Sequence, residues 1–151
     1  MILIIGYGNP LRGDDGVGPF IAYQLAESVT RRDVEVLARH QLTIELAEPI
    51  SRADQVFFID AAVNTEPGAI VVKCISAPDT PPLTGTHQLD PSLLLAYARE
   101  WYGKAPSALL IAVGGAAFDL CESFSPPVES AIPRVLRLID RFLRNSYTAH
   151  K

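Results

Sequence analysis

A glycine-rich segment follows the first apolar run of the chain and constrains the fold more than any other feature. The run is Ile2–Ile5, and the segment from Gly6 to Gly18 contains an adjacent pair of carboxylates, Asp14 and Asp15. A continuous aliphatic run that ends at glycine is typical of a strand buried on both faces, as in a parallel sheet. Ligands of open α/β sheets bind just outside the carboxyl ends of such strands. The sequence therefore predicts a functional site at this acidic pair.

The apolar patterns along the rest of the chain predict an α/β fold. Short aliphatic runs alternate with helical stripes that repeat every three or four residues. We expect further strands at 34–38, 56–59, 69–75 and 108–113, and helices at 17–29, 43–50, 91–101 and 128–143. The turn before 69–75 is too short for a parallel crossover, so this strand should run antiparallel to its predecessor, at an edge. The expected architecture is a three-layer α/β/α sandwich, with a mostly parallel, twisted sheet of about five strands, one of them antiparallel.

Individual side chains carry further expectations. Asp90 should cap the helix that opens at Pro91, and Trp101 should belong to the buried stripe of that helix. Cys74, inside a strand, should be a small core residue. The chain is expected to fold as one domain over residues 1–151, with a frayed tail at 146–151.

Composition and charge argue against several classes of protein. The 151 residues are 48% hydrophobic and carry a net charge of −4, which gives no basic footprint for nucleic acid. Cys74 and Cys121 lie far apart without Cys-x-x-Cys spacing, which argues against a disulfide framework or a structural zinc site. No apolar segment is long enough to cross a bilayer. We therefore expect a cytoplasmic protein that binds neither nucleic acid nor membranes.

Three side chains from separate segments form the candidate site. Asp15 follows the first strand, Asp60 ends the strand at 56–59, and His87 lies in a proline-rich loop that can cross the same sheet edge. Two carboxylates and an imidazole suit a divalent transition metal such as nickel or zinc. Taken singly, Asp14 or Asp15 could cap a helix, and Asp60 could belong to an Asx turn. His87 alone could be a solvated loop side chain, so spacing leaves these alternatives open.

The glycine-rich segment resembles a family motif. Gly-x-Gly-Asn at residues 6–9, followed by Asp-Asp-Gly-x-Gly at 14–18, is similar to the hydrogenase maturation proteases. These endopeptidases trim the C-terminal extension from the large subunits of nickel-iron hydrogenases. The resemblance extends in order along nearly the whole chain, to Phe58–Ala61, Thr86–Leu89, Ser125–Glu129 and Ile132-Pro133. It implies a phosphorylase/hydrolase-like α/β/α fold.

The resemblance also implies a role for each candidate residue. Asp15, Asp60 and His87 match the family's metal ligands, which form its catalytic site, and some members carry Glu at the position of Asp15. The implied metal is nickel that arrives with the substrate, and zinc or cadmium can occupy the same site. Asp14 is expected either to cap the helix or to support the ligands from behind. The implied partner is the large-subunit precursor; we expect a monomer, since this substrate is itself a large folded protein.

Other functions stay open as alternatives. A nickel-handling chaperone or docking module could use the same three ligands without peptidase activity. A nucleotide-binding α/β domain is opposed by Leu11, which stands where Gly-x-Gly-x-x-Gly needs its third glycine, and by the acidic pair. A cysteine protease would need Cys121 beside a histidine, but His40 and His150 have no supporting context. The sequence allows two interpretations of Tyr7, a surface residue or a contact for a peptide.

Overall fold

The computed structural model describes residues 1–80 and 89–149. The strands in this part are β1 (Ile2–Tyr7), β2 (Val34–Arg39), β3 (Gln55–Ala62), β4 (Ile70–Ile75) and β5 (Ser107–Gly114). The helices are α1 (Val17–Ser28), α2 (Ala47–Arg52), α3 (Pro91–Tyr102) and α4 (Pro126–Ala149). The 3₁₀ turns η1 (Gly13–Gly16) and η2 (Ile44–Leu46) lead into α1 and α2. Each predicted strand and helix is therefore present, and the helix predicted at 43–50 is divided between η2 and α2.

The five strands form one mixed sheet in the order β2-β1-β3-β5-β4. β1 pairs in parallel with β2 and β3, and β3 pairs in parallel with β5. β4 is an edge strand and pairs antiparallel with β5. The predicted α/β class, mostly parallel with one antiparallel strand, is confirmed. β4 also runs opposite to β3, as expected, but β5 lies between the two.

The edge position of β4 changes the expected role of Cys74. This side chain is exposed, so the prediction of a small core residue is wrong. An edge strand has only one neighbouring strand, and residues 72–74 of β4 all face solvent. The contribution of β4 to the core therefore comes from its two ends, Ile70 and Ile75, which are partly buried.

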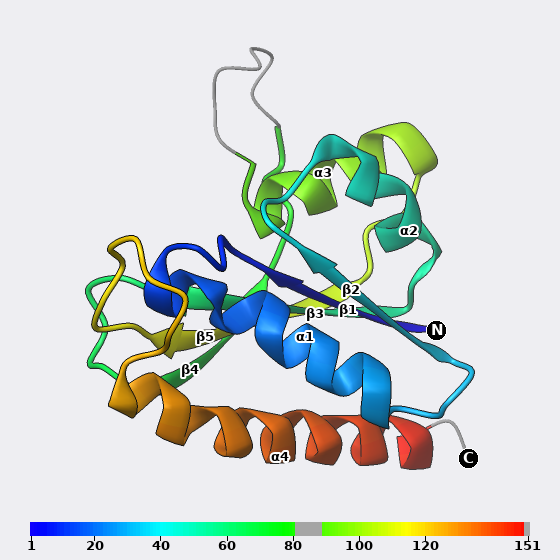
Figure 1. Ribbon diagram of the computed structural model, residues 1–151. Helices are drawn as coiled ribbons and strands as arrows, with labels where there is room; N and C mark the ends of the chain where they lie inside the picture. Colours follow the sequence, from blue (N-terminus) through cyan, green and yellow to red (C-terminus); the bar gives the residue numbers. More distant parts are fainter. Residues whose placement is uncertain (81–88, 150–151) are drawn as a thin grey trace.

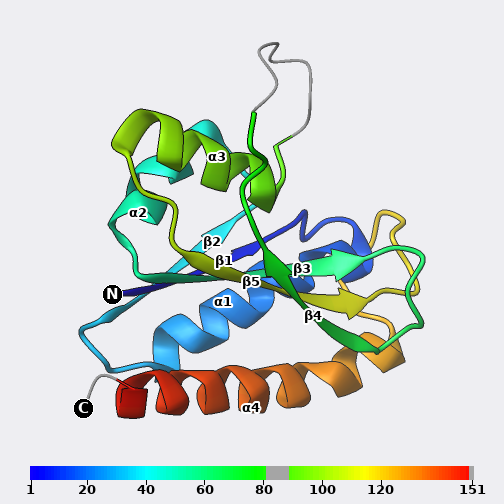
Figure 2. The same ribbon diagram turned by 180° about the vertical axis from the view of Figure 1, so that it is seen from behind.

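Helices cover both faces of the sheet (Figures 1 and 2): α1 and α4 lie on one face, and α2 and α3 on the other. The three-layer sandwich is thereby confirmed. Along β1, Ile2 and Ile4 belong to the apolar cluster with α1 and α4. Leu3 and Ile5 belong to the cluster with α2 and α3. This burial on two faces explains why the run is continuously apolar.

The start of α3 matches the prediction and its end does not. Asp90 Oδ1 accepts a hydrogen bond from Leu93 N–H at 2.8 Å, which confirms the cap. Trp101, however, is 53% exposed and does not belong to a buried stripe. The contacts with α2 involve residues one and two turns earlier, and Trp101 stacks instead on Tyr97 with ring centroids 4.8 Å apart.

α4 is the longest helix and continues past the point where a frayed tail is expected. It is helical to Ala149, which corrects the expectation for residues 146–149; residues 150–151 lie outside the described part. The hydroxyl of Ser146 donates to Phe142 O at 2.9 Å and lies 3.3 Å from Gln55 Oε1, so the end of the helix is tied to β3. Neither α4 nor another helix of the described residues is long and apolar enough to cross a membrane.

Two glycines allow the start of α1 to lie against the end of β1. A Cβ atom on Gly6 would lie 2.1 Å from Gly18 O, and one on Gly18 would lie 2.5 Å from Ile59 O. Any side chain at either position would push the helix away from the sheet. This contact holds η1, with Asp14 and Asp15, at the carboxyl end of β1.

Candidate functional site

The carboxyl ends of β2, β1 and β3 meet at one edge of the sheet, on the side away from both chain termini in Figure 1. A pocket of about 190 Å³ lies at this edge. It is lined by Tyr7, Gly8, Asp15, His40, Gln41, Leu42, Asp60 and Leu89. Asp15 and Asp60, predicted to meet from separate segments, therefore line the same pocket.

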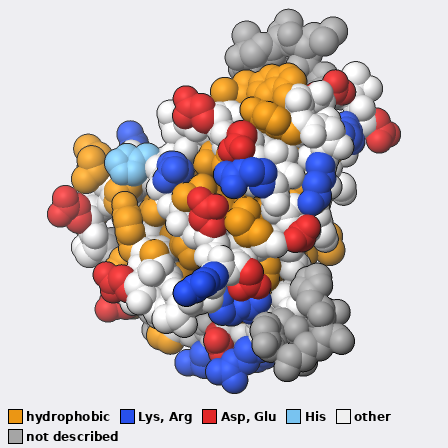
Figure 3. All heavy atoms as spheres, turned by 90° about the vertical axis from the view of Figure 1, so that its right-hand side faces the viewer, with side chains coloured by type: hydrophobic (Ala, Val, Ile, Leu, Met, Phe, Trp, Pro, Cys, Tyr) orange, Lys and Arg blue, Asp and Glu red, His pale blue; other side chains and the backbone are white. Residues whose placement is uncertain are grey.

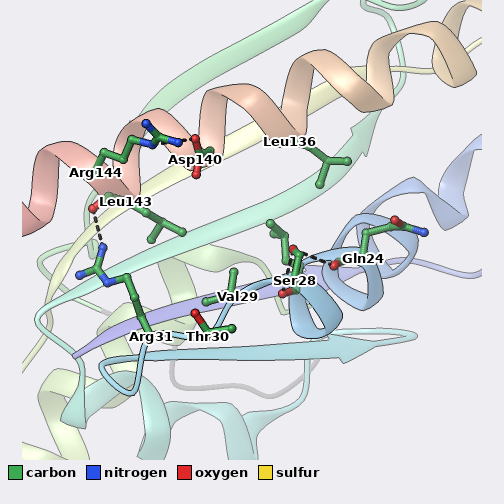
Figure 4. Close-up of a pocket in the computed structure, with 10 residues that line it drawn as sticks. Gln24, Ser28, Val29, Thr30, Arg31, Leu136, Asp140, Leu143 and Arg144 are labelled. Carbon is green, nitrogen blue, oxygen red and sulfur yellow. Dashed lines mark hydrogen bonds and ion pairs between the residues drawn. The ribbon is translucent and has the colours of Figure 1, made fainter.

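A larger cavity of about 460 Å³ lies between the ends of α1 and α4 (Figure 4). Its charged side chains are engaged by neighbours: Arg144 pairs with Asp140 at 2.9 Å, and Arg31 Nη1 donates to Leu143 O at 2.6 Å. Figure 3 views this end of the molecule, where basic and acidic side chains are interspersed. We therefore place the site at the opposite edge, where two carboxylates lie without an ion-pair partner among the described residues.

Asp60 lies inside β3 and not at its end. Ile59 forms the last pair with β1, opposite Gly6, whereas β3 continues to pair with β5 as far as Ala62. The prediction that the strand ends at Asp60 is therefore wrong, because β5 extends the ladder. The Asp60 carboxylate still lies at the sheet edge that carries the pocket, because the pairing of β3 with β1 ends at the preceding residue, Ile59.

Burial and hydrogen bonding act in opposite directions on Asp60. Burial, together with the negative charge of Asp15, raises the pKa of Asp60 to about 6. Hydrogen bonds from the Tyr7 hydroxyl and from Ala61 N–H, which lies 2.8 Å from Oδ1, limit this rise. Burial and the charge of Asp60 raise the pKa of Tyr7 well above its ordinary value, so the phenol is a neutral donor. Tyr7 thus holds Asp60 in place.

Asp15 is held by the loop that precedes it. Asn9 N–H donates to Asp15 Oδ2 at 2.6 Å, and Asp15 Oδ1 has no hydrogen bond within the described residues. The residue before α1 is Gly16, and no side chain of the described residues caps this helix. The interpretation of Asp14 or Asp15 as a helix cap is therefore wrong. Oδ1 of Asp15 is therefore accessible to a ligand as far as the described residues are concerned.

Gly8→Ala is expected to lower the free energy of unfolding by about 1–3 kcal/mol more than a Gly→Ala change at a position with positive φ and open space around it. The φ angle of Gly8 is +143°, and a Cβ atom there would lie 1.9 Å from Asp15 O. Gly103→Ala is the matched control, because Gly103 also has a positive φ, +79°, but no atom lies within 4 Å of the added Cβ. Urea unfolding of both variants separates the clash from the backbone strain. Equal losses in the two variants would contradict the prediction.

Asp14 is fully buried and fastens the loop between β5 and α4 to η1. Asp14 Oδ2 accepts hydrogen bonds from Ala116 N–H at 2.7 Å, from Ala117 N–H at 3.0 Å and from the Ser125 hydroxyl at 2.7 Å. Asp14 Oδ1 accepts from Ser125 N–H at 2.8 Å. Burial opposes ionisation, but the hydrogen bonds outweigh it and lower the pKa of Asp14. Asp14 therefore supports the segment that carries Asp15, which is one of the two roles expected for it.

Solved structures provide an independent comparison, whereas no protein-family model and no curated protein sequence matches the chain. The NiFe hydrogenase maturation protease HycI from Thermococcus kodakarensis KOD1 is 27% identical, with 95% of this chain and 92% of that chain covered and a TM-score of 0.76. The hydrogenase maturating endopeptidase HybD from E. coli is 25% identical, with 96% and 93% covered and a TM-score of 0.78. The resemblance of the chain to the hydrogenase maturation proteases is therefore confirmed.

A more distant structure of a hydrogenase maturation protease supports the fold alone. The hydrogenase 2 maturation peptidase from Thaumarchaeota archaeon SCGC_AB-539-E09 is 23% identical, with 94% of this chain and 97% of that chain covered. Its TM-score is 0.71. This likeness shows that the chain shares its fold with that peptidase.

The third predicted ligand, His87, lies outside the described residues. Leu89, two residues later in the sequence, lines the pocket. Within residues 1–80 and 89–149, no group of three or more His, Cys, Asp or Glu side chains could hold a metal ion. The assignment of Asp15, Asp60 and His87 as ligands therefore stays a prediction.

Two polar residues of the pocket, His40 and Gln41, are not among those expected from the sequence. They follow β2 directly, and β2 pairs in parallel with β1 through Arg39. The sequence alone does not show that β2 is the neighbour of β1. Nothing in the sequence therefore places His40 near Asp15 and Asp60. His40 is a polar residue just after a short predicted strand, and this pattern could have indicated a place in the site. Parallel neighbouring strands end at the same edge of a sheet.

Cys121 is not among the described residues that line the pocket of Asp15 and Asp60. Its thiol is exposed, and a hydrogen bond with the Ser123 hydroxyl at 3.1 Å and one from Ser123 N–H lower the pKa of the thiol. The backbone of Cys121 accepts a hydrogen bond from Gly13 N–H at 2.7 Å and donates one to Leu11 O at 2.9 Å. The observed contacts of Cys121 therefore tie the two loops together and do not support the cysteine-protease alternative.

Proposed function

We propose that this protein is an endopeptidase that removes the C-terminal extension from the nickel-loaded large-subunit precursor of a nickel-iron hydrogenase. One observation carries the proposal. Asp15 and Asp60, which come from separate segments, line one pocket at the functional edge of a fold shared with a maturation protease and a maturating endopeptidase. The proposal places the enzyme in the cytoplasm as a monomer.

Asp15, Asp60 and His87 would hold the nickel of the precursor, and zinc or cadmium would bind in the same place. The donor set fits such an ion, because carboxylate and imidazole ligands suit divalent transition metals. Asp15 Oδ1 accepts no hydrogen bond from the described residues and is available for coordination. The chemistry that such an ion would supply there is polarisation of the peptide carbonyl or activation of a water molecule.

The protein residues around the carboxylates prepare them for this role. Metal ligands must be deprotonated, and a pKa of about 6 leaves Asp60 mostly ionised at neutral pH. The hydrogen bond from Tyr7 orients Asp60, and Asn9 N–H orients Asp15. Side chains fixed in this way lose little conformational freedom when the substrate arrives.

Intact-mass spectrometry of the source organism's precursor tests the proposal. Nickel-loaded and nickel-free precursor are incubated with the wild type, Asp15→Asn and His87→Ala. We expect a single C-terminal truncation with nickel-loaded precursor and wild type only, with processing by the variants reduced about 100-fold or more. The matched control is Asp119→Asn, since Asp119 is an exposed acid that does not line the pocket; it should process normally.

Other outcomes have definite meanings. A complex that forms without truncation would favour a nickel-handling docking module or chaperone over a peptidase. Truncation of nickel-free precursor would remove nickel from substrate recognition. Full activity of His87→Ala would remove this residue from the site.

A further inference from the structure

The wall of the pocket formed by the end of β2 is held firmly in place. The carbonyl of Arg39 accepts a hydrogen bond from Gly8 N–H at 3.1 Å, which ties the start of this wall to the glycine-rich loop. Leu42 is only 8% exposed and packs in the cluster with α2 and α3, which anchors the other end. His40 and Gln41 lie between these anchors and line the pocket. Their backbone is therefore positioned before a ligand binds.

The side chains of His40 and Gln41 differ from the carboxylates in having no hydrogen-bond partner among the described residues. Asp15 accepts a hydrogen bond from Asn9 N–H, and Asp60 accepts one from Ala61 N–H. No hydrogen bond or ion pair joins the side chain of His40 or Gln41 to another described residue, and both residues are exposed. Their donors and acceptors are therefore available to a molecule that enters the pocket.

Among the described residues, His40 does not complete a metal site with Asp15 and Asp60. His40, Asp15 and Asp60 line one pocket, yet no three His, Cys, Asp or Glu side chains among the described residues are grouped so that they could share an ion. An imidazole and a carboxamide beside a metal site can instead bind peptide groups, since each pairs with backbone N–H or C=O. Leu42 and Leu89 add apolar surface to the same pocket.

We propose that His40 and Gln41 form a peptide-binding wall that holds the backbone of the substrate's C-terminal segment beside the two carboxylates. This inference rests on the proposed function, and it assigns these two residues to substrate positioning and not to metal binding. Two hydrogen bonds to the peptide account for about a tenfold to hundredfold contribution to substrate affinity.

The experiment uses His40→Ala, Gln41→Ala and the double variant. Binding of nickel-loaded precursor is measured by its Kd, processing by KM and kcat, and cadmium binding to the free protein by calorimetry. We expect the double variant to raise Kd and KM about tenfold or more, to change kcat much less, and to keep the cadmium affinity of the wild type. Gln24→Ala is the matched control, because Gln24 is an exposed glutamine that lines the other cavity. Thermal unfolding checks that each variant is folded.

Each other outcome overturns a specific statement. An unchanged Kd and KM in the folded double variant would overturn the inference and leave the proposed function intact. A loss of cadmium binding would overturn it by assigning His40 to the metal. Wild-type protein that binds the precursor without cleaving it would contradict the proposed function, while the Kd values would still test the wall. Wild-type protein that neither binds nor cleaves it would overturn both.

Discussion

Asp14→Ala is expected to lower the free energy of unfolding by about 3 kcal/mol or more at pH 7. Alanine removes an acceptor that is fully buried and leaves Ala116 N–H, Ala117 N–H and both donors of Ser125 without their partner. Each buried donor left without a partner carries a desolvation penalty. Urea unfolding measures the loss. Asp119→Ala, on the same loop but exposed, should change stability by less than about 0.5 kcal/mol.

The dependence on pH provides a second test of Asp14. Burial raises the pKa of Asp14, but the stronger combined effect of its hydrogen bonds holds the folded-state pKa below the ordinary value. The stabilisation is therefore complete above the pKa of the unfolded chain and is lost as the pH falls through the folded-state pKa. The difference between wild type and Asp14→Ala should shrink on acidification. A difference below about 1 kcal/mol at pH 7 would show that water satisfies the loop donors instead.

Asp60→Asn is expected to abolish processing and, at the same time, to stabilise the fold at pH 8 by about 1–3 kcal/mol. Burial and the charge of Asp15 raise the pKa of Asp60 from 3.8 to about 6, so ionisation of this carboxylate opposes folding. The upper limit is the free energy of this pKa change, at roughly 1.4 kcal/mol for each pH unit. Asparagine keeps an oxygen for Ala61 N–H, and its amide can donate to the Tyr7 hydroxyl.

The sign of this effect follows from linkage. In the wild type, the folded state binds more protons at Asp60 than the unfolded state between about pH 4 and pH 6, because the folded pKa is the higher one. The contribution of Asp60 to stability therefore falls as the pH rises through this window, and Asp60→Asn removes the fall. Urea unfolding at pH 4 and pH 8 should show a gain only at pH 8. A variant that is equally destabilised at both values would contradict the burial argument.

Local sequence patterns predict the elements well because each element has a local physical cause. The run Ile2–Ile5 supplies both apolar clusters, so its composition alone indicates a strand with two buried faces. Asp90 and Pro91 satisfy the exposed backbone groups at a helix start, and α3 begins there. The turn at Asn64–Gly68 is too short for a parallel crossover, which indicated the direction of β4. The shared pocket of Asp15 and Asp60 follows from parallel strands ending at one edge.

The features that could not be predicted depend on contacts between distant segments. Nothing local to Asp60 shows that β5 extends the ladder past it, and nothing local to His40 shows that β2 lies beside β1. The apolar spacing of Trp101 fits the helical stripe, but the packing of α2 against α3 ends before it. The partners of Asp14 are likewise absent from its neighbourhood in the sequence, so a helix cap was the natural interpretation of that acid.

The attachment of Asp14 to the distant loop also sets an order of events during protein synthesis. Chains emerge from the ribosome with the N-terminal residues first. Ala116 and Ser125 follow Asp14 by 102 and 111 residues. Most of the chain must therefore be synthesised before the buried carboxylate of Asp14 can form these hydrogen bonds. A nascent chain that stops before Ala116 therefore contains both Asp15 and Asp60 but lacks every partner that fastens Asp14. Interrupted translation therefore releases a chain whose glycine-rich loop is not fastened.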